Sequence, residues 1–320
     1  MRLAIISDIH YAGAAEQQRR DYPYGVIRNP LRRFVTRQWR HWLWHRDPFA
    51  HNHLLDQFLQ EASAADLVVA NGDYSCDSIG VGLVDEAAFQ SASECLGKLR
   101  QAFGERLRAV MGDHEIGKTM MAAPVGGLRL ASYRRALAEL KLEPLWRYEV
   151  GNRVLIGITS TLVALPVYAA EALPEEVPEW ERLRAEHLRG IQDYFAALRS
   201  DQRVLLFCHD PSALPFLWRD EVIRSRLSQI ERTILGHLHS NLILRSSGWL
   251  SGMPTIRFLG HTPRRISAAL REARCWRHFK PLLCPSTSGI QLLKDGGYLF
   301  GELKAKDGLA AQFELRRLKW

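Results

Sequence analysis

The sequence predicts an α/β fold in which buried strands alternate with helices in a layered sandwich. Short runs rich in valine, isoleucine and leucine have the length and near-continuous apolar character of strands that are covered on both faces. Amphipathic stretches with helical periodicity lie between these runs, which is typical of sheets covered by helices. We expect strands at 3–7, 67–70, 107–111, 154–159, 204–208 and 233–235, and helices at about 52–64, 85–102, 130–141, 179–199 and 219–229.

The last part of the chain has the pattern of a β-hairpin, and two other segments interrupt the alternation. Alternating runs at 297–304 and 310–318 flank Lys306-Asp307-Gly308, and an Asp-Gly pair between such runs predicts a tight turn. The segments at about 11–50 and 240–288 are longer than ordinary connections. We therefore expect a single domain over 1–320 with two inserted segments that form caps or substrate-binding elements.

Composition excludes several classes of protein. The chain has 320 residues, of which 47% are hydrophobic and 24% charged, as in an ordinary globular protein and unlike a disordered one. No apolar run is long enough to predict a transmembrane helix, and the first apolar run is too short for a signal peptide. The five cysteines are scattered, without a Cys-x-x-Cys pair. This pattern predicts reduced thiols in a cytoplasmic protein, and neither a disulfide framework nor a zinc knuckle.

Aspartate and histidine residues follow five of the predicted strands. Ligands bind beyond the carboxyl ends of strands in α/β sheets, so we expect these side chains to converge on one crevice. Residues two apart in extended backbone point to the same side, and glycines at the strand ends allow tight turns. A single histidine or aspartate in such a place is usually a cap or a surface residue, but five clusters favour a metal site. The clusters are Asp8-Ile9-His10, Gly72-Asp73, Gly112-Asp113-His114-Glu115, His209-Asp210 and Gly236-His237-Leu238-His239. Carboxylate and imidazole ligands together suit manganese, iron or zinc better than calcium.

These clusters resemble the five motif blocks of the calcineurin-like metallophosphoesterases, over about residues 1–240. The resemblance implies a four-layer α/β/β/α sandwich with two divalent metal ions, for which we expect manganese in this chain, with iron and zinc as alternatives. It also implies hydrolysis by a hydroxide that the two ions activate, without a phosphoenzyme. By the same resemblance Asp8, His10 and His239 hold one ion, His209 and His237 hold the other, Asp73 bridges both, and His114 faces the substrate phosphate.

One position departs from the family pattern. Asp113 stands where the family usually has an asparagine that binds the second ion. A carboxylate can still bind, but it adds a negative charge and lacks the amide N–H that could donate to a phosphate oxygen. We therefore expect the second ion to be held more firmly and an anionic phosphate to be attracted less strongly. Asp77 and Glu115 are alternative acidic partners for the His114 ring.

The segment at 29–46 has the pattern of a basic amphipathic helix. The whole chain carries a formal net charge of +8 and therefore attracts anionic partners. A basic helix with a tryptophan-rich side is typical of one that lies in a membrane interface, and the alternative is a helix packed on its own domain with arginines in solvent. We expect Arg33, Arg37, Trp39 and Trp42 to contact substrate. The apolar side comprises Leu31, Phe34, Val35, Trp39, Trp42 and Leu43, and the basic side Arg33, Arg37 and Arg40.

A second basic and aromatic patch lies in the other inserted segment. It is either a solvated charged loop, as most such runs are, or a binding element. Its members are Arg264, Arg265, Arg271, Arg274, Trp276, Arg277, His278, Phe279 and Lys280.

Together these features predict a metal-dependent phosphohydrolase that cleaves a phosphoester or pyrophosphate bond. If both inserted segments cap the site, the substrate is a phosphate with a large apolar part, such as the UDP-linked diacylglucosamine that some bacterial members of the family cleave. The protein would then lie in the cytoplasm, peripherally on the inner face of the membrane. The alternatives are a phosphodiesterase for nucleic acid or cyclic nucleotides, a simple phosphomonoesterase, and a non-catalytic metal-binding scaffold.

Overall fold

Two five-stranded sheets form the centre of the part of the chain that the structure describes. The structure is a computed structural model, and it describes residues 1–39, 41–42, 47, 49–120, 125–239, 241–256, 261–288, 296–303 and 311–319. The first sheet has the order β10 (Gln312–Arg317), β9 (Gly297–Glu302), β1 (Arg2–Ile6), β2 (Leu67–Asn71) and β3 (Leu107–Val110). The second has the order β4 (Leu145–Val150), β5 (Arg153–Ile158), β6 (Arg203–Cys208), β7 (Ile230–Leu235) and β8 (Pro281–Leu283).

Parallel strands occupy the middle of each sheet and antiparallel strands lie at one edge. β1, β2 and β3 are parallel in the first sheet, and β5, β6, β7 and β8 are parallel in the second. β9 and β10 form an antiparallel pair, and β4 is antiparallel to β5. The carboxyl ends of the parallel strands therefore lie at one edge of each sheet, where polar side chains can be brought together.

Alternate residues of the central strands face two different apolar cores. Leu3 and Ile5 of β1 pack in one core with Leu205 and Phe207 of β6, so this core lies between the two sheets. Ala4 and Ile6, which point the other way, pack in a second core together with helical residues such as Leu54 and Phe58. Because both faces of these strands are covered, their sequences are almost continuously apolar.

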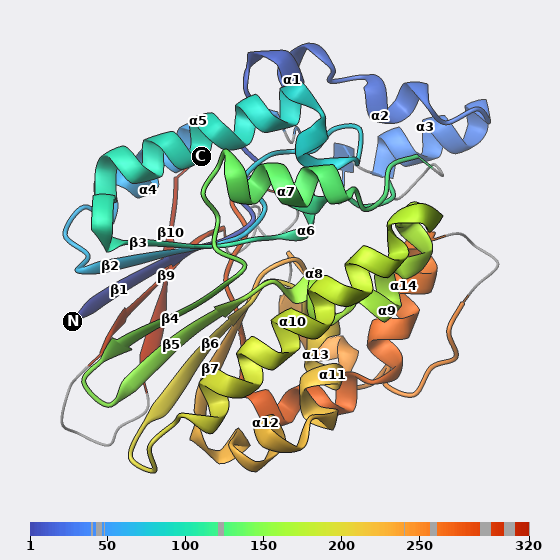
Figure 1. Ribbon diagram of the computed structural model, residues 1–320. Coiled ribbons are helices and arrows are strands. Elements are labelled where there is room, and N and C mark those ends of the chain that lie inside the picture. The colour runs from blue at the N-terminus through green and yellow to red at the C-terminus, as the bar shows by residue number, and fades with distance from the viewer. Residues whose placement is uncertain are drawn as a thin grey trace.

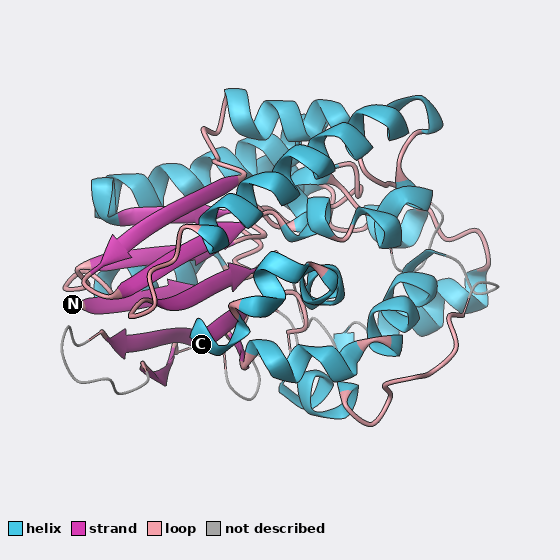
Figure 2. Cartoon of the chain, turned by 60° about the horizontal axis from the view of Figure 1, so that its bottom comes forward, coloured by secondary structure: helices cyan, strands magenta, loops and turns pink. Residues whose placement is uncertain are grey.

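Helices cover the outer face of each sheet, which gives the α/β/β/α layers that the sequence predicts (Figure 1). Figure 2 shows helices packed along the strands, and further helices gather beyond the ends of the strands. The first sheet is covered by α4 (Asn52–Glu61), α5 (Glu86–Phe103) and α7 (Leu130–Ala138), and the second by α10 (Val177–Ala196), α11 (Leu214–Arg219) and α12 (Glu221–Ser225). Short helices at the strand ends are α6 (Asp113–Ile116), α8 (Ser160–Val163) and α9 (Leu165–Tyr168).

The predicted elements agree with the structure except at edges and short turns. All six predicted strands are present with ends shifted by three residues or fewer, and β9 and β10 form the predicted antiparallel pair. The turn at 306–308 lies outside the described residues. β4 and β8 were not predicted, because an edge strand with exposed polar residues and a strand of three residues lack the continuous apolar pattern. The single helix expected at 219–229 is wrong, since α12 ends at Ser225 and a 3-10 turn follows.

The two inserted segments carry helices of their own. The first contains α1 (Ala14–Gln18), α2 (Tyr22–Gly25) and α3 (Pro30–Trp39), and the second contains α13 (Asn241–Ser247) and α14 (His261–Arg271). The second segment also contributes to the body of the fold, because Trp276 and Phe279 are buried and β8 pairs with β7. The interpretation of its basic patch as a solvated loop is therefore wrong for the aromatic residues and for Arg265, which is buried as well. Among the described residues no helix is long and apolar enough to cross a membrane.

A buried histidine between α10 and β5 predicts a pH dependence of folding stability. The backbone N–H of Thr159 donates to Nε2 of His187 at 3.2 Å, and burial lowers the pKa of His187 to about 4. The unfolded chain therefore binds one more proton than the folded one between that value and the ordinary pKa of about 6.5, so stability falls as the pH falls through this window. We expect wild type to lose about 2 kcal/mol more than His187→Gln between pH 7 and pH 5. Urea unfolding of both metal-free proteins at the two pH values measures this difference, and equal losses would contradict the prediction.

Candidate metal centre

Eight of the predicted site residues, the seven predicted ligands and His114, come together at the carboxyl ends of the strands. Asp8 and His10 follow β1, Asp73 follows β2, Asp113 begins α6 after β3, His209 follows β6, and His237 and His239 follow β7. The crevice is thus built from the ends of both sheets. Their potential ligand atoms form groups within 4.8 Å of one another: Asp8, His10 and His239 (the Asp8 group), Asp73, Asp113, His209 and His237 (the Asp113 group), and His10, Asp73 and His114.

Five residues of this centre have a left-handed backbone conformation. The φ angles of Asp8, His10, Asp73, His237 and His239 are 51°, 48°, 60°, 60° and 54°. Residues other than glycine rarely adopt this conformation, and each such residue costs on the order of 1–3 kcal/mol. Strain of this kind persists only where surrounding contacts impose it, and it is concentrated here at the residues whose side chains point to one place.

The glycines of the motif blocks are needed for two different reasons. Gly72 has a φ of 93°, so it provides the tight turn that the sequence predicts. Gly112 has an ordinary φ of −89°, but a Cβ atom there would lie 2.2 Å from Asp73 Oδ1. A Cβ at Gly236 would lie 2.3 Å from Ser7 Oγ. At these two positions glycine is required by close approach and not by backbone conformation.

Backbone carbonyls fix the orientation of four histidine rings. In each of them Nδ1–H donates to a carbonyl oxygen, which leaves Nε2 as the ring atom that can bind a metal ion when it is deprotonated, as in most metal-binding histidines. Nε2 of His10 is buried and makes no hydrogen bond within the described residues. These features fit the binding of metal ions. The pairs are His10 with Ser75 at 3.3 Å, His114 with Cys76 at 2.9 Å, His209 with Asn71 at 2.6 Å and His239 with Ser288 at 2.9 Å.

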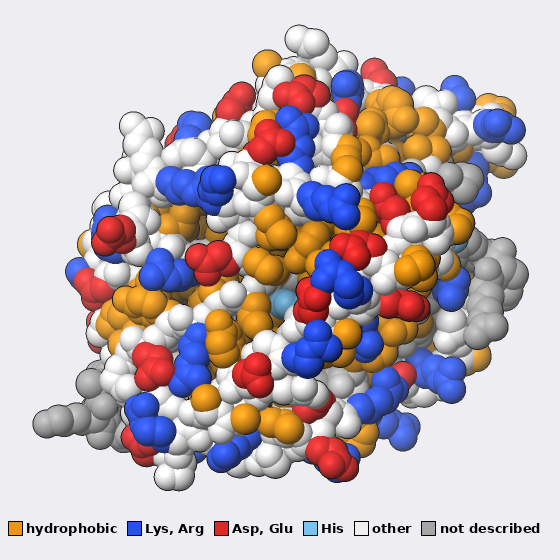
Figure 3. All heavy atoms as spheres, viewed as in Figure 1, with side chains coloured by type: hydrophobic (Ala, Val, Ile, Leu, Met, Phe, Trp, Pro, Cys, Tyr) orange, Lys and Arg blue, Asp and Glu red, His pale blue; other side chains and the backbone are white. Residues whose placement is uncertain are grey.

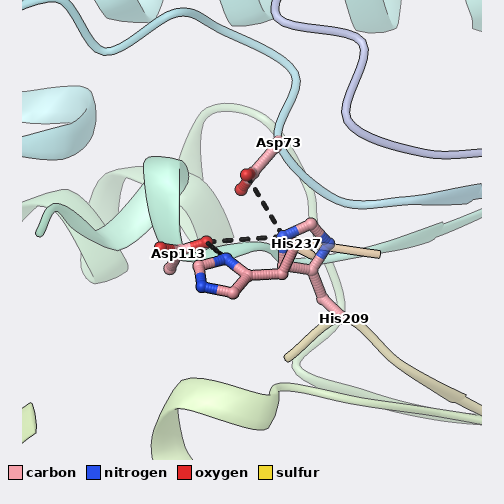
Figure 4. Close-up of side chains that lie close together, drawn as sticks. All are labelled: Asp73, Asp113, His209 and His237. Atoms are coloured by element: carbon pink, nitrogen blue, oxygen red, sulfur yellow. Dashed lines mark hydrogen bonds and ion pairs between the residues drawn. The ribbon is translucent and has the colours of Figure 1, made fainter. Parts of the chain in front are cut away.

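Asp73 lies between the groups. Its Oδ2 atom is 3.1 Å from Nε2 of His209, 3.7 Å from Nε2 of His114 and 3.9 Å from Nε2 of His10. Figure 4 shows Asp73 and Asp113 on two sides of the His209 ring, with His237 against Asp113. This is the position in which one carboxylate can serve two ions.

Charges divide the centre into two unlike halves. Burial, followed by the neighbouring His114, holds the pKa of His10 well below its ordinary value, so this ring is neutral, as a ligand must be. Burial also acts to lower the pKa of His209, but Asp73 and Asp8 outweigh it, and the pKa of this histidine is raised well above its ordinary value. The side of the centre that holds His209 therefore attracts positive charge, which suits a divalent cation.

Asp113 has a cationic partner that the sequence analysis did not identify. Nζ of Lys118 lies 2.7 Å from Oδ2 of Asp113, in a largely buried position. Burial acts to lower the pKa of Lys118, but Asp113 and Asp73 raise it above its ordinary value, so the ammonium group stays charged. The extra carboxylate could have pointed to such a partner, since a buried charge needs a counter-charge.

Glu115 supports the loops of the centre and does not contact the His114 ring. Its carboxylate accepts hydrogen bonds from the backbone N–H groups of Gly112 at 2.8 Å, Asp73 at 3.1 Å and Tyr74 at 2.8 Å. Asp77 accepts from the N–H of Gly82. The partner of the His114 ring is the Cys76 carbonyl, so neither acidic candidate has that role.

Other supporting residues come from the end of the second inserted segment and carried no motif in the sequence. Thr287 Oγ1 donates to the Asp8 and Ile9 carbonyls at 3.2 and 3.1 Å, and Ser286 Oγ donates to Asp8 O at 3.2 Å. Together with the Ser288 carbonyl they hold the turn that carries the Asp8 group. Only the fold brings them to β1, from about 278 residues away in the sequence.

The four predicted substrate contacts lie on or next to α3, at the rim of the molecule and beyond the strand ends (Figure 1). Arg33 donates to the Ile27 carbonyl at 3.0 and 2.8 Å, and the guanidinium of Arg37 lies 5.8 Å from the ring centre of Tyr24. Trp39 is half-buried, and Nε1 of the exposed Trp42 donates to Gln38 Oε1 at 3.1 Å. Their role in substrate binding stays a prediction.

Comparisons with known proteins show the family and the fold. The structure is similar to that of a dimetal phosphatase from Danio rerio, with a TM-score of 0.50 and 15% identity over 95% of this chain and 92% of that one, which shows the shared fold. A protein described as a 5′-nucleotidase from Staphylococcus aureus also matches, with a TM-score of 0.41 and 11% identity over 99% of this chain and 54% of that one. No curated protein matches the chain. The family described as calcineurin-like phosphoesterase matches residues 1–241. The chain therefore belongs to the calcineurin-like phosphoesterase family and is a metallophosphoesterase.

Proposed function

We propose that this enzyme hydrolyses a phosphoester or pyrophosphate bond in an amphiphilic substrate, with two divalent metal ions, manganese above all. In this proposal the Asp8 group holds one ion, the Asp113 group holds the other, and Asp73 serves both. The observation that carries it is the position of Asp73 Oδ2, which faces histidines of both groups at 3.1 and 3.9 Å. Mixed oxygen and nitrogen donors of this kind suit manganese, iron or zinc.

The chain's own residues have distinct tasks in this reaction. When bound, two such ions neutralise phosphate charge and make a water molecule a stronger nucleophile. His114 presents Nε2 to the substrate side, because its Nδ1–H is held by the Cys76 carbonyl at 2.9 Å. Once a bound phosphate favours the protonated ring, Nε2–H can donate a hydrogen bond to a phosphate oxygen or a proton to the leaving oxygen. Glu115 keeps the loops at Gly72 and Gly112 in place, so the ligands are positioned before substrate arrives.

The surface of the inserted segments supports an amphiphilic substrate. No residue of α3 is buried, and its apolar side chains Leu31 and Phe34 are 71% and 61% exposed. In the second segment Trp249 is 94% exposed. Figure 3 shows apolar side chains gathered over α2 and α3, with basic side chains close by. Exposed apolar groups beside arginines match a lipid with an anionic head group, and a UDP-linked diacylglucosamine has this chemistry. We infer a peripheral position on the inner face of the membrane.

The test of the proposed reaction varies two properties of the substrate separately, the type of phosphate bond and the presence of acyl chains. The protein is loaded with Mn²⁺ and given phosphomonoester, phosphodiester and pyrophosphate substrates, each in a soluble form and in a form with acyl chains. We expect the acylated form of one bond type to be turned over best. Preference for a soluble nucleotide or for single-stranded nucleic acid would overturn the amphiphilic assignment, and no hydrolysis of any of them would overturn the whole proposal.

Substitutions on α3 test the role of its apolar side. We expect Leu31→Gln with Phe34→Gln to weaken binding to anionic lipid vesicles by about tenfold or more, because each side chain loses on the order of 1.5–3 kcal/mol of apolar burial. Stability should barely change, since both side chains are exposed and glutamine is a good helix former. Val222→Gln, at an exposed apolar position on α12, is the matched control. Vesicle co-sedimentation measures the effect, and equal binding by both variants and wild type would contradict it.

A further inference from the structure

The two oxygens of Asp113 face different partners. Oδ1 lies 3.1 Å from Nδ1 of His237 and 3.4 Å from Nε2 of His209, so this atom belongs to the ligand cluster. Oδ2 lies 2.7 Å from Nζ of Lys118. The two oxygens of this carboxylate therefore have separate partners. Oδ1 faces the candidate metal ligands, and Oδ2 faces the ammonium of Lys118.

Asp113 and Lys118 together offer the same groups as an asparagine side chain. An asparagine in the same place would offer one oxygen as a ligand and N–H groups as donors, without a negative charge. Here Oδ1 is the oxygen ligand, the ammonium of Lys118 cancels the additional negative charge, and its N–H groups are the donors. An ammonium has three hydrogens, and the contact with Asp113 needs only one of them.

The ammonium of Lys118 acts electrostatically on two further residues of the centre. The Lys118 side chain is 20% exposed, so it is not completely closed off from solvent. Its charge acts on His114, whose pKa is lowered to about 4 by burial and then by Lys118, and it acts on Asp73 as well. Lys118 therefore lies near both the ring that faces the substrate and the carboxylate between the two groups.

The loop that carries Lys118 is anchored to the second inserted segment. The N–H of Thr119 donates to Oε2 of Glu171 at 2.8 Å. Glu171 is in turn bound by Nη1 of Arg265 on α14, at 2.9 and 2.8 Å, in a buried ion pair. Because these contacts hold the backbone next to Lys118, its side chain can be positioned before a phosphate arrives.

We propose that Asp113 and Lys118 act as one unit in place of the family's asparagine, and that Lys118 donates hydrogen bonds to a phosphate oxygen of the substrate. This inference rests on the proposed function, since it concerns the same site. It replaces the expectation that Asp113 weakens the attraction of phosphate, because the pair carries no net charge. It also names a phosphate-binding residue outside the motif blocks.

A double-mutant cycle tests the pair without relying on turnover. The proteins are wild type, Lys118→Met, Asp113→Asn and the double variant, and titration calorimetry measures the Kd of Mn²⁺ and then of orthophosphate. We expect Lys118→Met to weaken orthophosphate binding by about tenfold or more, as for the loss of a charge-assisted hydrogen bond. We expect Asp113→Asn to weaken Mn²⁺ binding, because Lys118 is left without its partner beside two cations. The double variant should return to within about threefold of wild type for orthophosphate, since the effects of paired residues do not add.

Control variants separate the pairing from general damage. Lys98→Met removes another lysine that lies 2.7 Å from an aspartate, Asp56 on the surface, and it should change neither Kd. If Lys118→Met does not fold, Lys118→Gln keeps polarity without charge and should show the same loss of orthophosphate. Additive effects in the cycle, or orthophosphate binding within about twofold of wild type after loss of Lys118, would overturn the inference. If wild type binds neither Mn²⁺ nor orthophosphate, the proposed function fails instead.

Discussion

Replacing Asp73 by asparagine should reduce phosphoester hydrolysis by about a thousandfold, because a shared ligand supports several kcal/mol of transition-state stabilisation and each 1.36 kcal/mol is a factor of ten. Oδ2 of Asp73 is 3.1 Å from His209 and 3.9 Å from His10, so its charge serves both halves of the centre. Asparagine has the same shape and tolerates the left-handed φ of 60°, so the loss reports charge and not strain. Initial rates with saturating Mn²⁺, together with the number of ions bound per chain, measure the effect.

Asp77→Asn is the matched control for this experiment. Asp77 is also buried, and its φ is 44°. Burial raises its pKa well above the ordinary value, so the folded protein favours a neutral side chain here, which asparagine resembles. We expect this variant to keep its rate within about threefold of wild type, since neither charge nor shape changes much. An Asp73→Asn enzyme as active as the Asp77→Asn enzyme would show that Asp73 is not a ligand.

Glu115→Gln should lower Mn²⁺ affinity or activity by about 10–100-fold, the usual effect of losing a residue that orients metal ligands. One carboxylate accepts three backbone N–H groups, from Gly112, Asp73 and Tyr74. An amide can present only one oxygen, so at least one buried N–H is left without an acceptor, at a cost of about 1–3 kcal/mol in stability. Urea unfolding of the metal-free protein and Mn²⁺ titration measure the two effects.

A substitution at a second glutamate, Glu176, separates an effect on folding stability from an effect on metal binding. Glu176 also accepts a backbone N–H, from Leu130 at 2.9 Å, but it lies outside the metal centre. We expect Glu176→Ala, which removes the acceptor of this N–H, to reduce stability and to leave Mn²⁺ affinity unchanged. If Glu115→Gln lost stability alone, in the same way as this control, Glu115 would have no part in positioning the ligands.

The central strands and the motif blocks could be predicted because local sequence is sufficient for them. β1 and β6 are covered on both faces, so apolar runs alone reveal them, whereas β4 lies at an edge and exposes Glu149. The ligand residues directly follow such strands, and the carboxyl ends of parallel strands share one edge of a sheet. Their convergence could therefore be predicted.

The exposure of the apolar side of α3 could not be predicted from the periodicity of the sequence. The pattern at 29–46 predicts an amphipathic helix, and α3 is present at Pro30–Trp39, while residues 40 and 43–46 lie outside the described residues. A helix packed on its own domain and a helix that offers its apolar side to a partner have the same pattern. The position of α3 beyond the strand ends, with no buried residue, is visible only in the structure, and it is the basis for proposing a partner.

The sequence by itself determined the layered α/β fold, the family and the residues that converge in the candidate metal centre, because strand periodicity and motif spacing are local. The tertiary structure alone decided how those residues are held and charged. Glu115 binds the Gly72–Asp73 turn, Ser286 and Thr287 hold the turn after β1, and Lys118 pairs with Asp113. No spacing of residues in the sequence predicts these contacts, because each depends on where one loop passes another after the sheets have packed. The charge of the centre is therefore a property of the folded chain, and the aspartate that departs from the family pattern has its counter-charge within hydrogen-bonding distance.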